Sequence, residues 1–131
     1  MHHFRSKAEL FAAAIGYLAD RQLAEIRAAT PTTREERLAA IRAAMSGPVF
    51  QAGLELWMAA RTDEALRAAL LPSQREIGRA VREVLGPEFA DRAVYESLLM
   101  LLRGLALTSV LRDDPELADE ILARWLAQVP R

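Results

Sequence analysis

The stretch "PVFQAGLELWMAAR" (Pro48–Arg61) decides the fold, because at helical spacing its apolar side chains cover most of the circumference. Two polar residues one turn apart, Gln51 and Glu55, interrupt the apolar surface. A helix that is apolar on most sides is surrounded by protein. We therefore predict a bundle with this helix at its centre. Its apolar residues form two neighbouring stripes, Phe50, Leu54 and Trp57 beside Val49, Gly53, Leu56 and Ala60.

Helix start and stop signals divide the rest of the chain. Ser6 with Glu9, and Thr33 with Glu36, have the spacing of a capping box at a helix start. Thr62 is expected to cap the fourth segment, and Pro72 to break or kink it. The expected helices cover residues 7–28, 34–45, 48–61, 63–85 with the interruption at Pro72, 91–112 and 115–129.

The composition fits one all-α domain, a bundle of about six helices. The chain has 131 residues, is half apolar, and is rich in strong helix formers with no strand-like alternation. A net charge of −1 argues against a surface that grips nucleic acid by itself. The absence of cysteine fits a reducing cytoplasm. The most apolar run, Leu98 to Leu111, is too short to span a bilayer and contains Arg103, so no membrane association is expected.

The sequence offers little material for catalysis, and we predict that the protein is not an enzyme. The only histidines are the adjacent His2 and His3, too few for a histidine-based metal site within the bundle. There is no glycine-rich phosphate loop, and acidic pairs such as Asp63-Glu64 stand at expected helix starts, where capping explains them. We expect no catalytic residue, no metal and no cofactor.

A ligand cavity between helices is a more plausible site than a catalytic centre. Large or adaptable side chains on the two most apolar helices are typical of such pockets, although the same pattern also describes an ordinary core. A few polar residues within these helices could orient a ligand. The apolar candidates are Phe50, Trp57, Met58, Tyr95 and Met100, and the polar ones are Gln51, Glu55 and Arg103.

The last two expected helices, over 91–112 and 115–129, are apolar on more than one face. Such surface exceeds what one core can cover, which favours burial against a second subunit. The alternative is a deep core within a single chain.

The N-terminal stretch "HHFRSKAELFAAAI" (His2–Ile15) resembles a junction found in TetR-family transcriptional regulators. In that family a recognition helix ends in a His-His-Phe-like segment, a Ser-Lys turn follows, and a Glu-Leu-containing helix leads into the regulatory domain. Two further stretches resemble parts of that domain, "LELWMAARTDEALRAAL" (Leu54–Leu70) and "LLRGLALTSVLRDDPE" (Leu101–Glu116). The residues that match the junction are His3, Phe4, Ser6, Lys7, Glu9 and Leu10.

The resemblance implies that residues 1–6 are the end of a helix-turn-helix DNA-binding domain and that 7–131 form the ligand-binding and dimerisation domain. The helix over 7–28 would be the linking helix, and a small hydrophobic effector would bind near Phe50, Leu54, Trp57, Met58, Tyr95 and Met100. His3 and Lys7 would lie near the DNA backbone, whereas the recognition helix lies outside this sequence. A homodimer is implied through Leu98, Leu102, Leu105, Ser109, Leu117, Ile121, Leu122 and Trp125.

Two other functions stay open at this point. The chain could be an interaction protein without a DNA-binding head that heterodimerises with a full-length regulator. It could equally be a helical bundle that binds a hydrophobic ligand with no link to DNA.

Overall fold

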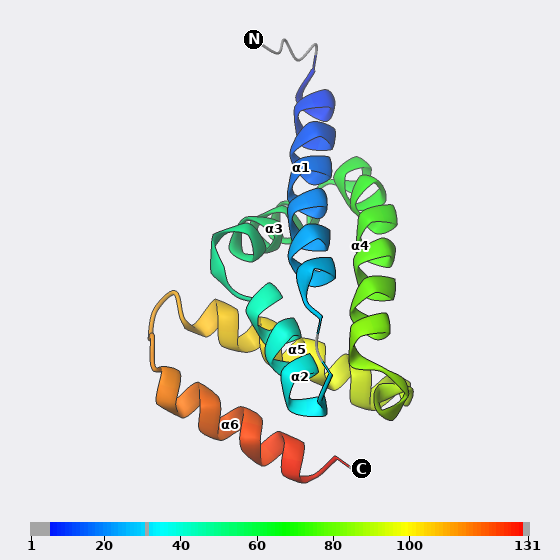
Figure 1. Ribbon diagram of the computed structural model, residues 1–131. Helices are drawn as coiled ribbons and strands as arrows, with labels where there is room; N and C mark the ends of the chain where they lie inside the picture. Colours follow the sequence, from blue (N-terminus) through cyan, green and yellow to red (C-terminus); the bar gives the residue numbers. More distant parts are fainter. Residues whose placement is uncertain (1–5, 31, 130–131) are drawn as a thin grey trace.

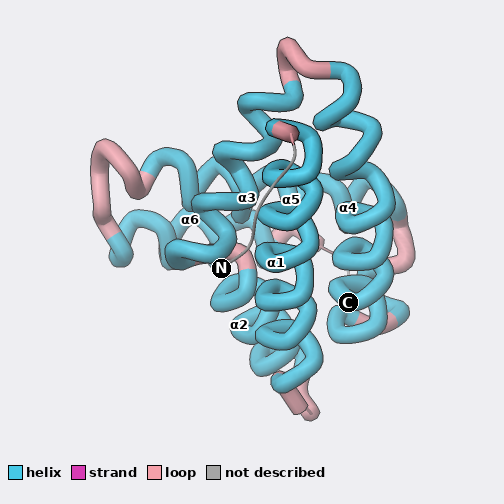
Figure 2. The backbone as a smooth tube through the Cα atoms, turned by 90° about the horizontal axis from the view of Figure 1, so that it is seen from above, coloured by secondary structure: helices cyan, strands magenta, loops and turns pink. Residues whose placement is uncertain are grey.

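The computed structural model describes residues 6–30 and 32–129, and all regular structure in these residues is helical. Short loops join the helices (Figure 2). The predicted all-α fold is confirmed. The elements are α1 (Lys7–Ala28), α2 (Arg34–Ala44), α3 (Gly47–Ala60), α4 (Glu64–Leu85), the 3-10 turn η1 (Pro87–Phe89), α5 (Arg92–Thr108) and α6 (Pro115–Ala127).

The first two helices begin where their capping residues predict. The Ser6 hydroxyl accepts a hydrogen bond from the Glu9 amide at 3.1 Å, which fixes the start of α1. Thr33 and Glu36 form a reciprocal capping box at the start of α2. Each cap satisfies amides that a helix start would otherwise leave unpaired.

The start of α4 differs from the sequence expectation. The cap is Asp63, whose carboxylate accepts a hydrogen bond from the Leu66 amide at 3.0 Å, and not Thr62. The reason is that Thr62 still belongs to the turn that leaves α3, with its amide donating to the carbonyl of Ala59.

Of the two expectations at Pro72, the break is wrong, because α4 runs as one helix from Glu64 to Leu85, whereas a kink stays a prediction. Proline in a helix interior removes one hydrogen bond and costs about 3 kcal/mol. Leu70 and Ile77, on either side of the proline, are both buried against other helices. Packing on both sides therefore offsets the local penalty, and the helix continues.

The core consists of two apolar clusters. The main cluster joins all six helices and is densest around five fully buried side chains, whereas a smaller cluster of Ile15, Ala60, Leu66 and Leu70 joins α1, α3 and α4. α1 and α4 lie side by side (Figure 1) and contribute to both clusters. α1 and α4 therefore connect the two clusters. The five side chains are Ile26, Ile41, Val81, Leu85 and Leu98.

α3 is less enclosed than its apolar sequence predicts. Phe50, Leu54 and Ala60 are buried, but Trp57 is partly exposed and Met58 is 57% exposed. α1, α2, α4 and α5 all contact α3, but these contacts leave its surface at Trp57 and Met58 exposed. The apolar sequence of α3 therefore predicted more complete burial than this helix has.

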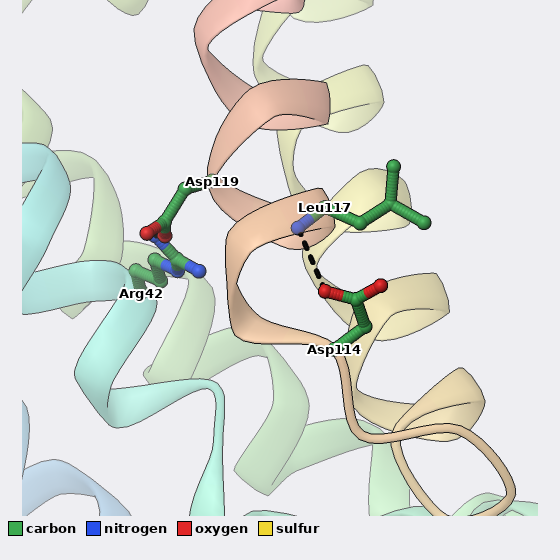
Figure 3. Close-up of polar contacts among 4 residues, drawn as sticks. All are labelled: Arg42, Asp114, Leu117 and Asp119. Atoms are coloured by element: carbon green, nitrogen blue, oxygen red, sulfur yellow. Dashed lines mark hydrogen bonds and ion pairs between the residues drawn. The ribbon is translucent and has the colours of Figure 1, made fainter.

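α5 and α6 lie at the end of the molecule opposite the start of α1 (Figure 1). α6 contributes one buried residue to the core, Leu122. Two polar contacts near its start support it (Figure 3): Arg42 of α2 pairs with Asp119, and Asp114 caps the helix by accepting from the Leu117 amide at 3.1 Å. Among residues 6–30 and 32–129, no helix has both the length and the apolar character needed to cross a membrane.

Candidate ligand cavity

A cavity of about 650 Å³, partly open to solvent, lies between α3, α4 and α5 and reaches α1 at Gln22. Its volume falls within the range of small-molecule pockets, about 300–1,000 Å³. The wall combines an apolar surface with a charged edge. The apolar surface is formed by Met45, Phe50, Leu54, Trp57, Leu71 and Leu99.

The cavity brings together five of the nine residues predicted to bind a ligand: Phe50, Leu54, Trp57, Tyr95 and Arg103. Three come from α3 and two from α5, so residues far apart in the sequence meet at one wall. Their shared position agrees with the predicted location of a pocket. Ligand binding by these residues stays a prediction.

The other predicted residues lie elsewhere. Met58 and Met100 are 57% and 64% exposed, and Glu55 is also exposed; none of the three lines the cavity. The Gln51 side chain is engaged in structure, because its amide donates to the carbonyl of Ala106 at 2.8 Å and so joins α3 to the last turn of α5. Helical spacing identified apolar faces but not which of them turns toward the cavity.

Tyr95 presents its ring to the cavity while its hydroxyl is held by the backbone. The residue is 2% exposed, and its hydroxyl donates to the carbonyl of Gly78 in α4 at 3.2 Å. The guanidinium of Arg82 lies 4.6 Å from the centre of the ring. Burial raises the pKa of Tyr95, and the positive charge of Arg82 partly opposes this effect. The side chain therefore links α4 to α5 along the cavity wall.

Arg103 approaches the cavity from α5 and covers Trp57 of α3. Its guanidinium lies 4.5 Å from the centre of the Trp57 ring, a distance typical of cation–π stacking. Burial lowers the pKa of Arg103, and the charge of Glu96 partly restores it. An arginine side chain stays protonated in proteins, so a partly desolvated cation faces this part of the wall.

Most residues of the charged edge of the cavity were not among the predicted site residues. Arg75, Arg79 and Arg82 of α4 line it, together with Arg92 and Glu96 of α5. The three arginines of α4 have spacings of four and three residues, which place them on one helix face. That spacing was visible in the sequence, but an arginine face usually points into solvent, and only the packing of α4 shows that it borders a hollow.

The residues predicted at a dimer interface divide into two groups. Leu98, Leu102 and Leu122 lie in the core of the chain itself and not on its surface, because α5 and α6 turn these leucines toward the main cluster. The others are accessible to differing degrees: Leu105, Leu117, Ile121 and Trp125 are partly buried, and Ser109 is exposed.

The large exposed apolar residues of α5 and the turn after it are Met100, Leu107, Val110 and Leu111. Met100 and Leu107 stand seven residues apart on α5, and Leu111 lies in the turn beyond Thr108; we call these three the exposed stripe. A group of exposed apolar residues is a more specific signal of an interface than a single exposed leucine.

Of the two residues predicted near a DNA backbone, only Lys7 can be placed. It is the exposed first residue of α1, and its ammonium group lies 5.3 Å from the centre of the Phe11 ring. His3 lies outside the described residues.

Within the described part of the chain, no group of three or more histidine, aspartate or glutamate side chains is placed to hold a metal ion. Comparison of the chain with known protein families, curated proteins and solved structures found no match. The TetR-family resemblance is therefore a prediction from the sequence motifs.

Proposed function

We propose that the chain is the effector-binding and dimerising regulatory domain of a TetR-like transcriptional regulator. A small hydrophobic effector would control DNA binding by a helix-turn-helix unit outside these 131 residues. The observation that carries this proposal is the cavity between α3, α4 and α5, which has the volume and mixed wall of a small-molecule site and touches the first long helix at Gln22.

The packing of α1 and α4 suggests how an effector would act. α4 forms one wall of the cavity and lies along α1, the helix that the resemblance identifies as the linking helix. A ligand that binds one arrangement of α4 more tightly shifts the population toward that arrangement. Because α1 packs on α4, its position would shift as well, which is the movement a linking helix needs.

Cavity binding can be tested with a matched pair of glycines. Gly53 lines the cavity and Gly16 lies on α1 outside it; both are helical and partly buried, and neither has an atom within 4 Å of where a Cβ would stand. We expect Gly53→Leu to weaken binding of the neutral dye Nile red at least about tenfold, because the new side chain occupies ligand space, whereas Gly16→Leu leaves binding unchanged. Equal binding by Gly53→Leu and the unchanged chain would contradict the cavity assignment.

A regulatory domain also differs from a bundle that only binds ligands. Ligand binding should slow hydrogen exchange of α1 amides around Gln22 as well as amides of α3 and α4, because α1 packs on α4 and reaches the cavity at Gln22. Protection confined to α3, α4 and α5 would favour a ligand-binding bundle without a linking helix. Mass spectrometry of peptides from each helix, with and without Nile red, makes this comparison.

The homodimer is the second part of the proposal. The exposed stripe of Met100, Leu107 and Leu111 supports it, because a symmetric dimer buries the same surface on both copies. Partly buried Leu117, Ile121 and Trp125 of α6 would extend that surface. Sedimentation at micromolar concentration should show a dimer, and a monomer alone would contradict this part.

A further inference from the structure

The charged residues of the cavity wall are strongly unequal in sign. Five are arginines and one is a glutamate, although the whole chain carries a net charge of only −1. The positive charge is therefore a local property of this site. The six residues are Arg75, Arg79, Arg82, Arg92, Arg103 and Glu96.

In the described part of the chain, no ion pair joins these arginines to a carboxylate, although Glu96 lies near enough to act on the charge of Arg103. The ion pairs of Arg27, Arg42 and Arg124 all lie off the cavity wall. Arg103 is partly buried, and the nearby charge of Glu96 offsets only part of the desolvation of its guanidinium. A cation in that situation gains more from an incoming anion than a fully hydrated one does.

Two of the arginines lie over aromatic rings at the wall. Arg103 of α5 stacks on Trp57, and Arg82 of α4 stacks on Tyr95, with guanidinium-to-ring distances of 4.5 and 4.6 Å. Stacking occupies the face of a guanidinium and leaves its N–H edge available for paired hydrogen bonds to a planar or tetrahedral anion. Phe50, also on the wall, belongs to the apolar part of the same cavity.

We infer that the effector is an amphipathic anion, with an apolar body against the α3 side of the cavity and a carboxylate or phosphate held by Arg103 and Arg82. This inference rests on the proposed function of the cavity as an effector site. It narrows the expected small hydrophobic effector to one that carries negative charge.

Three ligands of equal chain length test the role of the charge. Calorimetric titration of the full chain with decanoate, decyl phosphate and the neutral 1-decanol should show at least one anion binding about ten- to a hundredfold more tightly than the alcohol, the range expected for a charge-assisted hydrogen bond. Tighter decyl phosphate assigns the site to phosphates, and tighter decanoate assigns it to carboxylates.

Arginine variants then locate the charge. The pair Arg82→Gln and Arg103→Gln should reduce anion affinity to that of 1-decanol without changing the affinity for 1-decanol itself. Arg61→Gln is the matched control, because Arg61 is exposed and lies off the cavity wall. If Arg103→Gln loses helicity, Arg103→Lys replaces it and should retain the preference for the anion.

The outcomes separate this inference from the proposed function. Equal affinity of all three ligands in the unchanged chain would overturn the anion assignment and leave a neutral effector site standing. Anion affinity that falls no further in the Arg82 and Arg103 variants than in Arg61→Gln would overturn the placement of the charge. Absence of binding by all three ligands, together with absence of Nile red binding, would overturn both the inference and the effector site.

Discussion

Replacing Tyr95 by phenylalanine separates the structural role of this cavity residue from any role in ligand binding. The substitution removes the hydroxyl that donates to the Gly78 carbonyl at 3.2 Å and keeps the ring beneath Arg82. The carbonyl of Gly78 lies inside α4 and keeps its intrahelical bond. The loss is therefore one neutral hydrogen bond, about 0.5–1.5 kcal/mol of unfolding free energy. For a chain of this size that corresponds to a fall in melting temperature of roughly 2–8 °C.

The same variant should change the dependence of stability on alkaline pH. Burial raises the pKa of Tyr95 above its ordinary value of 10.0. The folded state thus holds the phenol proton more tightly than the unfolded state does. This contribution is fully present below pH 10 and is lost as the pH rises through the folded pKa. The stability difference between the unchanged chain and Tyr95→Phe should therefore shrink above pH 10.

Tyr17 supplies the control, because it is the other tyrosine of the chain and is 61% exposed. Urea unfolding followed by circular dichroism, at one fixed protein concentration, should show Tyr17→Phe to be as stable as the unchanged chain. In that variant Tyr95 is the only phenol, so tyrosinate absorbance reports its pKa directly. Titration of Tyr95 at or below pH 10, or equal stability of the two variants, would refute the reasoning.

Three further predictions follow from helix ends and helical glycines. Asp114→Ala removes the cap of α6 and should lower the unfolding free energy by about 1 kcal/mol, measured by urea denaturation. Asp114→Asn should retain most of the stability that the cap provides, because asparagine also caps helices. A Cβ at Gly16 or Gly104 would meet no atom within 4 Å, so Gly16→Ala and Gly104→Ala should each raise the unfolding free energy of the monomer by up to about 1 kcal/mol. If α5 forms the dimer interface, only Gly104→Ala should alter the dimer dissociation constant in sedimentation experiments. The pKa of Glu36 is lowered chiefly by the hydrogen bond from the Thr32 amide, then by those from the Thr32 hydroxyl and the Thr33 amide. These hydrogen bonds contribute stability above pH 4.5 that is lost as the pH falls through the folded pKa, and Glu36→Gln should flatten this acid dependence in thermal melts.

Local signals were sufficient to predict most of the helix boundaries. A cap such as Ser6 or Thr33 depends on atoms within a few residues, so its effect can be read from adjacent sequence. Continuity through Pro72 depends instead on Leu70 and Ile77 packing against different clusters. No local pattern contains that information, so from the sequence both a break and a kink stayed open at Pro72, and only the break is excluded.

The cavity was predictable in position but not in its lining. Phe50, Leu54 and Trp57 share a helix face by spacing alone, and that face does border the hollow. Met58 and Met100 satisfied the same criterion of size and polarity and yet point to solvent. Periodicity shows which residues share a face, whereas the orientation of that face is set by the neighbouring helices.

The position of the cavity relative to the two core clusters connects its contents to α1. Ile77 of the main cluster lines it, and so does Leu71, which adjoins Leu70 of the smaller cluster. The same hollow thus meets the part of α4 that joins the clusters, and it reaches α1 at Gln22. A ligand there adds contacts to α3, α4 and α5 at once. It lies beside the part of α4 between the residues of the smaller cluster and those of the main cluster. Under the proposed function, a ligand at this level contacts the part of α4 that joins the two clusters, and because α4 packs on α1, a preference for one arrangement of α4 also shifts α1.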